Sequence, residues 1–312
     1  MNETYDNVLL AAKVLTVSSY CITSIVGILG NGLVIWISGY KMKTVSAVWI
    51  LNLAIADFIF CLCLPLRIAA LILNEEFVLP EYIDMDLQIL NIFNFFMLNI
   101  NASVSVTFLA VISIDRCAAI LCPFWTKRHR TRKLANIASV FLWIVPLTIM
   151  LAFLFLFHGH IHTYYLTELY TFPQYEFSHD TFSNHILMLK NLLMFGIPFA
   201  IILVSYGLII CKLCSNTFRR PKGFQRTFRI IMATVGCFFL CWFPFNMWPY
   251  IARRIDISES LTDLMVTSCC LCLVSISSCL NPIIYVLLGR IHGSTARNSI
   301  KARIENIIND FK

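Results

Sequence analysis

The stretch from Leu87 to Trp125, LQILNIFNFFMLNINASVSVTFLAVISIDRCAAILCPFW, decides the fold of this chain. Its first 28 residues, Leu87 to Ile114, carry no formal charge. At ~1.5 Å rise per residue, a helix of this length spans roughly 42 Å. That length exceeds the ~30 Å hydrocarbon core of a bilayer, so the stretch predicts a long, tilted membrane-spanning helix. The Asp115-Arg116 pair where this helix leaves the lipid is costly unless it forms an ion pair or contacts a partner.

The rest of the chain extends this prediction. Of its 312 residues 59% are hydrophobic and only 13% are charged, far below the ~25% charged content of soluble domains. Seven apolar stretches have spanning length, namely 16–39, 46–72, 87–114, 134–157, 187–211, 230–252 and 264–288. We therefore expect an all-α membrane protein, a seven-transmembrane helix bundle with a short amphipathic eighth helix. The expected parts are an extracellular N-terminal tail (1–15), the seven-transmembrane domain (16–288), and the eighth helix with a short cytoplasmic tail (289–312).

The distribution of charge predicts the orientation of the bundle. With the N-terminus outside, 19 of the 24 Lys and Arg residues fall on the cytoplasmic side, as the positive-inside rule requires. The five outer cations are Lys13, Arg67, Lys190, Arg253 and Arg254. The sequon Asn2-Glu3-Thr4 predicts glycosylation of Asn2, which agrees with an outer N-terminus at the cell membrane. The basic inner face favours anionic membrane lipids and an acidic cytoplasmic partner, not nucleic acid.

Two function classes are disfavoured by the sequence. An enzyme would need a nucleophile-base pair or a metal-binding cluster. The one exception to their absence is His158-Gly159-His160-Ile161-His162, which we interpret as interfacial histidines rather than an adventitious metal site. A transporter would need several charges inside the membrane or an inverted repeat, whereas Asp57 is nearly alone in the spans. We therefore expect neither catalysis nor a tightly bound cofactor.

Asp57 is a carboxylate deep in the second span, so it should face the interior of the bundle and find polar partners or a cation. Ser105, Ser277 and Asn281 are the polar side chains available on other spans. Two interpretations are open. These four residues could form an allosteric sodium site, or Asp57 could be protonated and hydrogen-bonded.

A set of motifs identifies the chain with a known family. The motifs occur in order along nearly the whole chain: Asn31, LNLAIADF (51–58), IDRC (114–117), CPFW (122–125), Trp143, Pro198, Tyr206, CWFP (241–244) and NPIIY (281–285). Together they resemble the rhodopsin-like (class A) G-protein-coupled receptors. The stretches GILGNGLVIW (27–36), IDRCAAILCPFWTKRHRT (114–131) and FFLCWFPF (238–245) resemble the chemoattractant branch, which includes formyl-peptide and chemerin-type receptors.

The resemblance implies an activation mechanism and a partner. Arg116 would be held by Asp115 at rest and released to Tyr206 and a heterotrimeric G protein on activation, with the inhibitory class of G protein expected. Trp242, above the helix kink at Pro244, would sense the ligand. Asn281 and Pro282 would allow Tyr285 to turn inward. No acidic residue near Phe224 offers Arg116 a second partner, so appreciable basal activity is expected.

The ligand is less closely defined by the resemblance. Leu98 stands where amine receptors carry an aspartate, which disfavours an amine, and Asn99 stands where formyl-peptide receptors carry one. The expected ligand-binding residues are Arg67, Asn99, Lys190, Trp242 and Arg253. The cations among them suit a ligand carboxylate, such as a peptide C-terminus or a lipid acid. Two alternatives stay open: these cations could pair with acidic residues of the outer loops, or those loops could attract a basic ligand.

Two departures from the family pattern affect function. The outer disulfide of most class A receptors is absent, since Asn91 replaces one cysteine and residues 158–184 contain none. MAS-related receptors also lack this bridge and are an alternative assignment, as is a non-signalling or scavenging receptor of the same fold. After residue 289 only Ser294, Thr295 and Ser299 could be phosphorylated, so weak arrestin binding is expected.

Overall fold

The computed structural model describes residues 3–41, 44–73, 85–156, 188–214, 224–255 and 260–288. Several predictions lie outside these residues: glycosylation of Asn2, the eighth helix and the tail. The side chains of Arg253 and Tyr285 also lie outside the description. The elements are α1 (Glu3–Trp36), η1 (Ile37–Lys41), α2 (Val45–Leu73), α3 (Met85–Leu121), α4 (Pro123–His129), α5 (Arg132–Leu156), η2 (Leu192–Gly196), α8 (Ile197–Cys214), α9 (Phe224–Arg254) and α10 (Leu261–Leu288).

Within the described residues, seven helices are long and apolar enough to cross a membrane. They are Tyr5–Tyr40, Val45–Ile72, Ile92–Leu121, Arg132–Phe155, Met188–Lys212, Met232–Ala252 and Leu261–Ile284. Each overlaps one of the seven apolar stretches, so the seven-helix bundle expected from the sequence is confirmed. One boundary differs: α1 begins at Glu3, so most of the expected tail (1–15) continues the first helix without a break.

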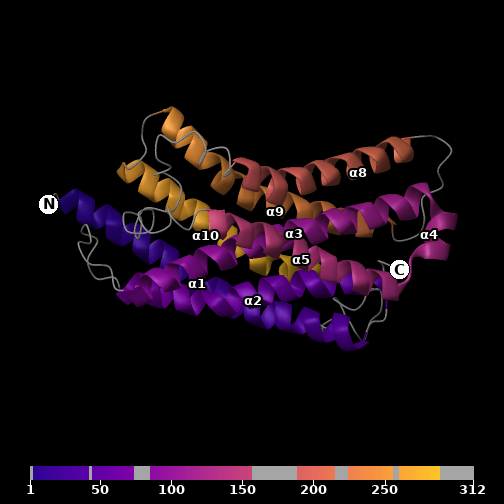
Figure 1. Ribbon diagram of the computed structural model, residues 1–312, viewed down its shortest axis with the longest axis horizontal. Coiled ribbons are helices and arrows are strands. Elements are labelled where there is room, and N and C mark those ends of the chain that lie inside the picture. The colour runs from indigo at the N-terminus through magenta and orange to yellow at the C-terminus, as the bar shows by residue number, and fades with distance from the viewer. Residues whose placement is uncertain are drawn as a thin grey trace.

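Helix α3 lies at the centre of the bundle. In Figure 1 it runs along the middle of the molecule, with α8 and α9 on one side and α1 and α2 on the other. It packs directly against α2, α5, α8 and α9. Polar side chains spaced along this helix therefore face several neighbours, and the three clusters described below all include residues of α3.

Helix α1 packs closely against α2 and α10 because two glycines leave room for its neighbours. A Cβ atom on Gly30 would lie 2.8 Å from Pro282 Cγ, and one on Gly27 would overlap Cys61 Sγ. Small residues of this kind allow membrane helices to approach where larger side chains would separate them. The contact positions α10 relative to α2, on which the Asp57 site depends.

Candidate functional site

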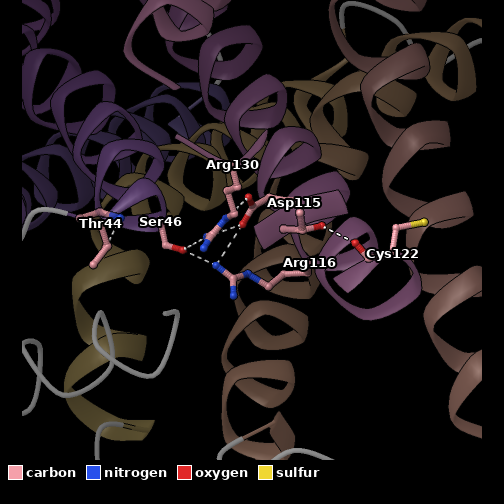
Figure 2. Close-up of polar contacts among 8 residues, drawn as sticks. Thr44, Ser46, Asp115, Arg116, Cys122 and Arg130 are labelled. Carbon is pink, nitrogen blue, oxygen red and sulfur yellow. Dashed lines mark hydrogen bonds and ion pairs between the residues drawn. The ribbon is translucent and has the colours of Figure 1, made fainter. Parts of the chain in front are cut away.

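A cluster of charged side chains joins α2, α3 and the turn between α4 and α5. We call Ser46, Asp115, Arg116 and Arg130 the Asp115 cluster (Figure 2). Arg130 donates two hydrogen bonds to the Asp115 carboxylate, from Nε to Oδ1 at 2.7 Å and from Nη2 to Oδ2 at 2.8 Å. Arg116 Nη2 lies 3.1 Å from the same Oδ2. The Ser46 hydroxyl accepts from both arginines, so one carboxylate and one hydroxyl hold two guanidinium groups.

Local sequence explains how Arg130 reaches Asp115. Pro123 begins the short helix α4, where its missing N–H costs nothing, and the backbone N–H of Arg130 ends it by donating to Thr126 O at 2.9 Å. The chain then turns at Thr131 before α5 begins. This turn brings Arg130 back beside the end of α3.

Tyr206 approaches the Asp115 cluster from α8. Its side chain is buried, and it lies close enough to Arg116 of α3 to interact with it electrostatically. The structure thus places the three residues expected to form the activation switch, Asp115, Arg116 and Tyr206, in one neighbourhood. Arg130 and Ser46 complete it, and the sequence analysis had assigned no role to either.

A second cluster surrounds Asp57 in the middle of the bundle. Asn101 Nδ2 donates to Asp57 Oδ1 at 3.0 Å, Ser105 Oγ to Oδ1 at 3.4 Å, and Asn281 Nδ2 to Oδ2 at 2.8 Å. Asn101 Oδ1 in turn accepts from Ser278 Oγ at 3.2 Å. We call these five residues the Asp57 network. It links α2, α3 and α10, and every described partner of Asp57 is a neutral donor.

The network differs in two members from the set expected on sequence grounds. Ser277 was expected beside Asp57, but its hydroxyl donates to Val274 O at 2.6 Å and accepts from Trp242 Nε1 at 3.1 Å. Its neighbour Ser278 points into the network instead. Asn101 is not among the residues expected at this site. Its amide is a central member of the network because it bonds to α2 and α10 together.

Trp242 joins α9 to α10 and to a row of aromatic rings. Besides its bond to Ser277, its indole stacks on Phe238 with ring centroids 5.8 Å apart and meets Phe245 edge-on at 5.9 Å. Phe238 stacks in turn on Phe195 of η2 at 6.3 Å. A displacement of Trp242 would therefore disturb its contact with α10 and, through Phe238, the contact with η2. Pro244 lies inside α9 next to this row, where it removes one backbone hydrogen bond.

The third cluster contains a buried cation. Lys190 precedes η2, and only 8% of its surface is exposed. Its Nζ donates to Asn99 Oδ1 at 3.0 Å and lies 5.3 and 4.9 Å from the ring centroids of Phe95 and Phe153. We call these four residues the Lys190 cluster. In the part of the chain that the structure describes, Lys190 has no carboxylate partner.

Arg67, another of the expected ligand-binding residues, faces a different neighbour. It follows Pro65 inside α2, and its guanidinium lies over the ring of Tyr20 on α1, 5.5 Å from the centroid. Tyr20 is almost fully buried. The contacts place Arg67 against α1, whereas Lys190 and Asn99 join α3 to the segment before η2.

Comparison with known proteins agrees with this geometry. Residues 30–285 match the model of the family described as 7 transmembrane receptor (rhodopsin family). The chain is 32% identical to the C3a anaphylatoxin chemotactic receptor of Danio rerio, over 99% of this chain and 81% of that protein. It is 31% identical to the N-formyl peptide receptor 3 of Homo sapiens, over 93% of this chain and 83% of that protein.

A third relative is the formyl peptide receptor-related sequence 4 of Mus musculus, 30% identical over 93% of this chain and 89% of that protein. These relatives are receptors, not enzymes. The seven spans, the motifs in their expected order and the relatives agree with one another. The chain is a multi-pass membrane protein that belongs to the rhodopsin family (class A) of G-protein-coupled receptors, in its chemoattractant branch.

Proposed function

We propose that this receptor binds an extracellular peptide or lipid ligand through an acidic group at Lys190 and activates a heterotrimeric G protein of the inhibitory class. The Lys190 cluster is the observation that supports an acidic ligand. Lys190 is only 8% exposed, and its partners are one amide and two aromatic faces. Burying a charge is costly unless it is paired. A ligand carboxylate would supply the missing counter-ion.

Asn99 supports this assignment over a basic ligand. An aspartate at this place would neutralise Lys190 internally, whereas the asparagine gives Nζ a neutral acceptor, and no carboxylate of the described residues pairs with it. Asn99 Nδ2 is already used, because it donates to Phe95 O at 2.9 Å. Its oxygen is thus oriented toward the lysine. A peptide C-terminus or a fatty acid carries the charge that this cluster lacks.

Variants at Lys190 test the ligand class. We would screen peptides ending in a free carboxylate, the same peptides as amides, and fatty acids, reading G-protein activation. For an acidic agonist we expect Lys190→Gln to lower potency by about 30-fold or more, because removing one partner of a buried ion pair costs ~2–5 kcal/mol. Lys190→Arg keeps the charge and should retain part of the potency. Agonists that act equally as amides and on Lys190→Gln would overturn the assignment.

The Asp57 network supports an allosteric sodium ion. Its oxygen atoms come from a carboxylate, hydroxyls and amide carbonyls, which are the hard ligands that such a cation prefers. The carboxylate has no cationic side chain near it among the described residues. Asp57, Ser105 and Asn281 would hold the ion, with Asn101 beside them. Ser277, which faces Trp242, is replaced in this proposal by Ser278.

The remaining parts of the proposal follow from the family and the sequence. The N-terminus and the Lys190 end of the bundle face the outside of the cell membrane, and the Asp115 cluster faces the G protein and the anionic lipids of the inner leaflet. We also propose weak arrestin binding, because residues 289–312 offer only Ser294, Thr295 and Ser299 as phosphate acceptors. A recruitment assay showing strong, tail-dependent arrestin binding would contradict this. Ligand uptake without G-protein activation would favour the scavenging receptor instead.

A further inference from the structure

The turn between α4 and α5 concentrates positive charge around one hydroxyl. Residues 127–133 read KRHRTRK, with five Lys or Arg and no acid. Thr131 is exposed in this turn, outside both helices. The buried Nε of Arg132 has no hydrogen-bond partner among the residues that the structure describes. An exposed hydroxyl thus has cations on both sides of it in the sequence, and among the described residues only Arg130 of these cations forms an ion pair.

The backbone around Thr131 favours an anion at its side chain. Its Oγ accepts from Leu134 N at 3.3 Å, and its carbonyl accepts from Ala135 N at 3.1 Å, so Thr131 caps the first turn of α5. Helix α5 is 25 residues long, and negative charge at the N-terminus of a helix is stabilised by its dipole and free N–H groups. The helix N-terminus and the adjacent arginines would therefore both stabilise negative charge on the Thr131 side chain.

We propose that Thr131 is a phosphorylation site for a basophilic serine/threonine kinase, and that its phosphate draws Arg130 away from Asp115. The donor is ATP: Thr131 Oγ forms a bond to the γ-phosphorus as the bond to the β-phosphate oxygen breaks, ADP leaves, and the hydroxyl proton passes to the kinase's base. Cations on both sides of the acceptor, at Arg128, Arg130, Arg132 and Lys133, are what such a kinase selects.

Three other hydroxyls described at this end of the bundle are buried, whereas Thr44 before α2 is half-buried and also caps a helix, accepting from Ala47 N at 3.1 Å. Thr126 is buried inside α4 with its Oγ donating to Cys122 O at 3.0 Å, and Ser46 is buried within the Asp115 cluster. Ser139 is also buried, donating to Ala135 O at 2.9 Å. Among these, Thr131 combines an exposed side chain with a non-helical backbone.

The phosphate would act through a shared carboxylate. Arg130 now occupies Asp115 Oδ1 and shares Oδ2 with Arg116. A phosphothreonine beside Arg130 offers it a stronger acceptor, since phosphate-arginine hydrogen bonds are charge-assisted. Both oxygens of Asp115 then become available to Arg116. This step rests on the proposed function, because tighter retention of Arg116 means slower activation of the G protein.

The test uses the full-length receptor in lipid vesicles, a purified kinase of the protein kinase C class, ATP, and an inhibitory G-protein heterotrimer. Phosphopeptides are mapped by mass spectrometry, and nucleotide exchange on the G protein is followed with and without ATP treatment. The variants are Thr131→Ala, Thr131→Ser, Arg130→Gln and Arg116→Ala. We expect about one phosphate per receptor at position 131, retained in Thr131→Ser and lost in Thr131→Ala.

Exchange driven by the treated wild type should fall at least about fivefold, the lower end of typical coupling between sites. ATP treatment should not change the nucleotide exchange driven by Thr131→Ala or by Arg130→Gln. The first variant has no hydroxyl at position 131 to accept the phosphate, and the second lacks the arginine that the phosphate would displace. Phosphate on other residues alone would overturn the site. Unchanged or faster exchange after phosphorylation at Thr131 would overturn its effect on Arg130. If untreated wild type is no faster than Arg116→Ala, the proposed coupling fails, and the peptide map still decides the site.

Discussion

At the residue scale, Arg116 and Arg130 share the Asp115 carboxylate, and we propose that their competition for it sets the activation switch. Arg130 holds the carboxylate at 2.7 and 2.8 Å with two nitrogens, whereas Arg116 reaches only one oxygen, at 3.1 Å. Bidentate pairing is the stronger geometry. Arg116 is therefore held less firmly than a dedicated Asp-Arg pair would hold it. This agrees with the basal activity expected from the missing acidic partner near Phe224.

Replacing Arg130 tests this competition. In Arg130→Gln the Asp115 carboxylate is left to Arg116 alone, so we expect basal nucleotide exchange on the G protein to fall about fivefold. Arg128→Gln is the matched control, since it removes one exposed positive charge from α4, two residues away. Equal effects of the two substitutions would mean that only the net charge of this turn matters.

The Asp57 network gives a second prediction at this scale. We expect sodium, compared with equal concentrations of potassium, to lower basal exchange in the wild type. In Asp57→Asn this difference should vanish, because the carboxylate that would bind the ion is gone while the amide can still bond to Asn101 and Asn281. A sodium effect that survives in Asp57→Asn would place the ion elsewhere.

At the element scale, the approach of α1 to α2 and α10 depends on two glycines. Gly27→Ala would force its new Cβ into the Sγ of buried Cys61, so we expect a loss of ~1–3 kcal/mol in stability, as overpacking generally costs. Thermal unfolding of the purified receptor, followed by tryptophan fluorescence, measures it. Gly207→Ala is the control. Apart from the nearby backbone of its own helix, no atom lies within 4 Å of the new Cβ.

A rescue experiment separates the overlap from a general effect of alanine. Cys61→Ala removes the sulfur that the Gly27 methyl would meet. The double variant should then unfold at a higher temperature than Gly27→Ala alone. Equal unfolding temperatures for these two variants would show that the close approach at Gly27 does not limit stability.

The elements also show what the sequence could and could not predict. The seven spans follow from hydropathy, because a single apolar segment can satisfy its own backbone hydrogen bonds within lipid only as a helix. The sequence could not predict that Ser278, and not Ser277, joins the Asp57 network. Adjacent residues on a helix point about 100° apart, and the rotation of α10 about its axis is set by packing. Arg130 was missed because it reaches Asp115 through the turn after α4, whose geometry hydropathy does not encode.

At the scale of the whole molecule, α3 connects the three clusters. Asn99 belongs to the Lys190 cluster, Asn101 and Ser105 to the Asp57 network, and Asp115 to the cluster at the other end. Asn99 and Asp115 lie 16 positions apart, which corresponds to roughly 24 Å of helix. We propose that a ligand at one end biases the switch at the other by moving this one helix relative to α8, α9 and α10.

The measurement that tests this account most directly compares the wild type with Arg116→Ala in cells, before any ligand is added. Forskolin-raised cyclic AMP is recorded at matched surface expression, with and without pertussis toxin, which blocks inhibitory G proteins. The account predicts lower cyclic AMP in the wild type, a difference that disappears with the toxin and with Arg116→Ala. Equal cyclic AMP in all four conditions would contradict it, since a switch held as loosely as Arg116 should signal without ligand.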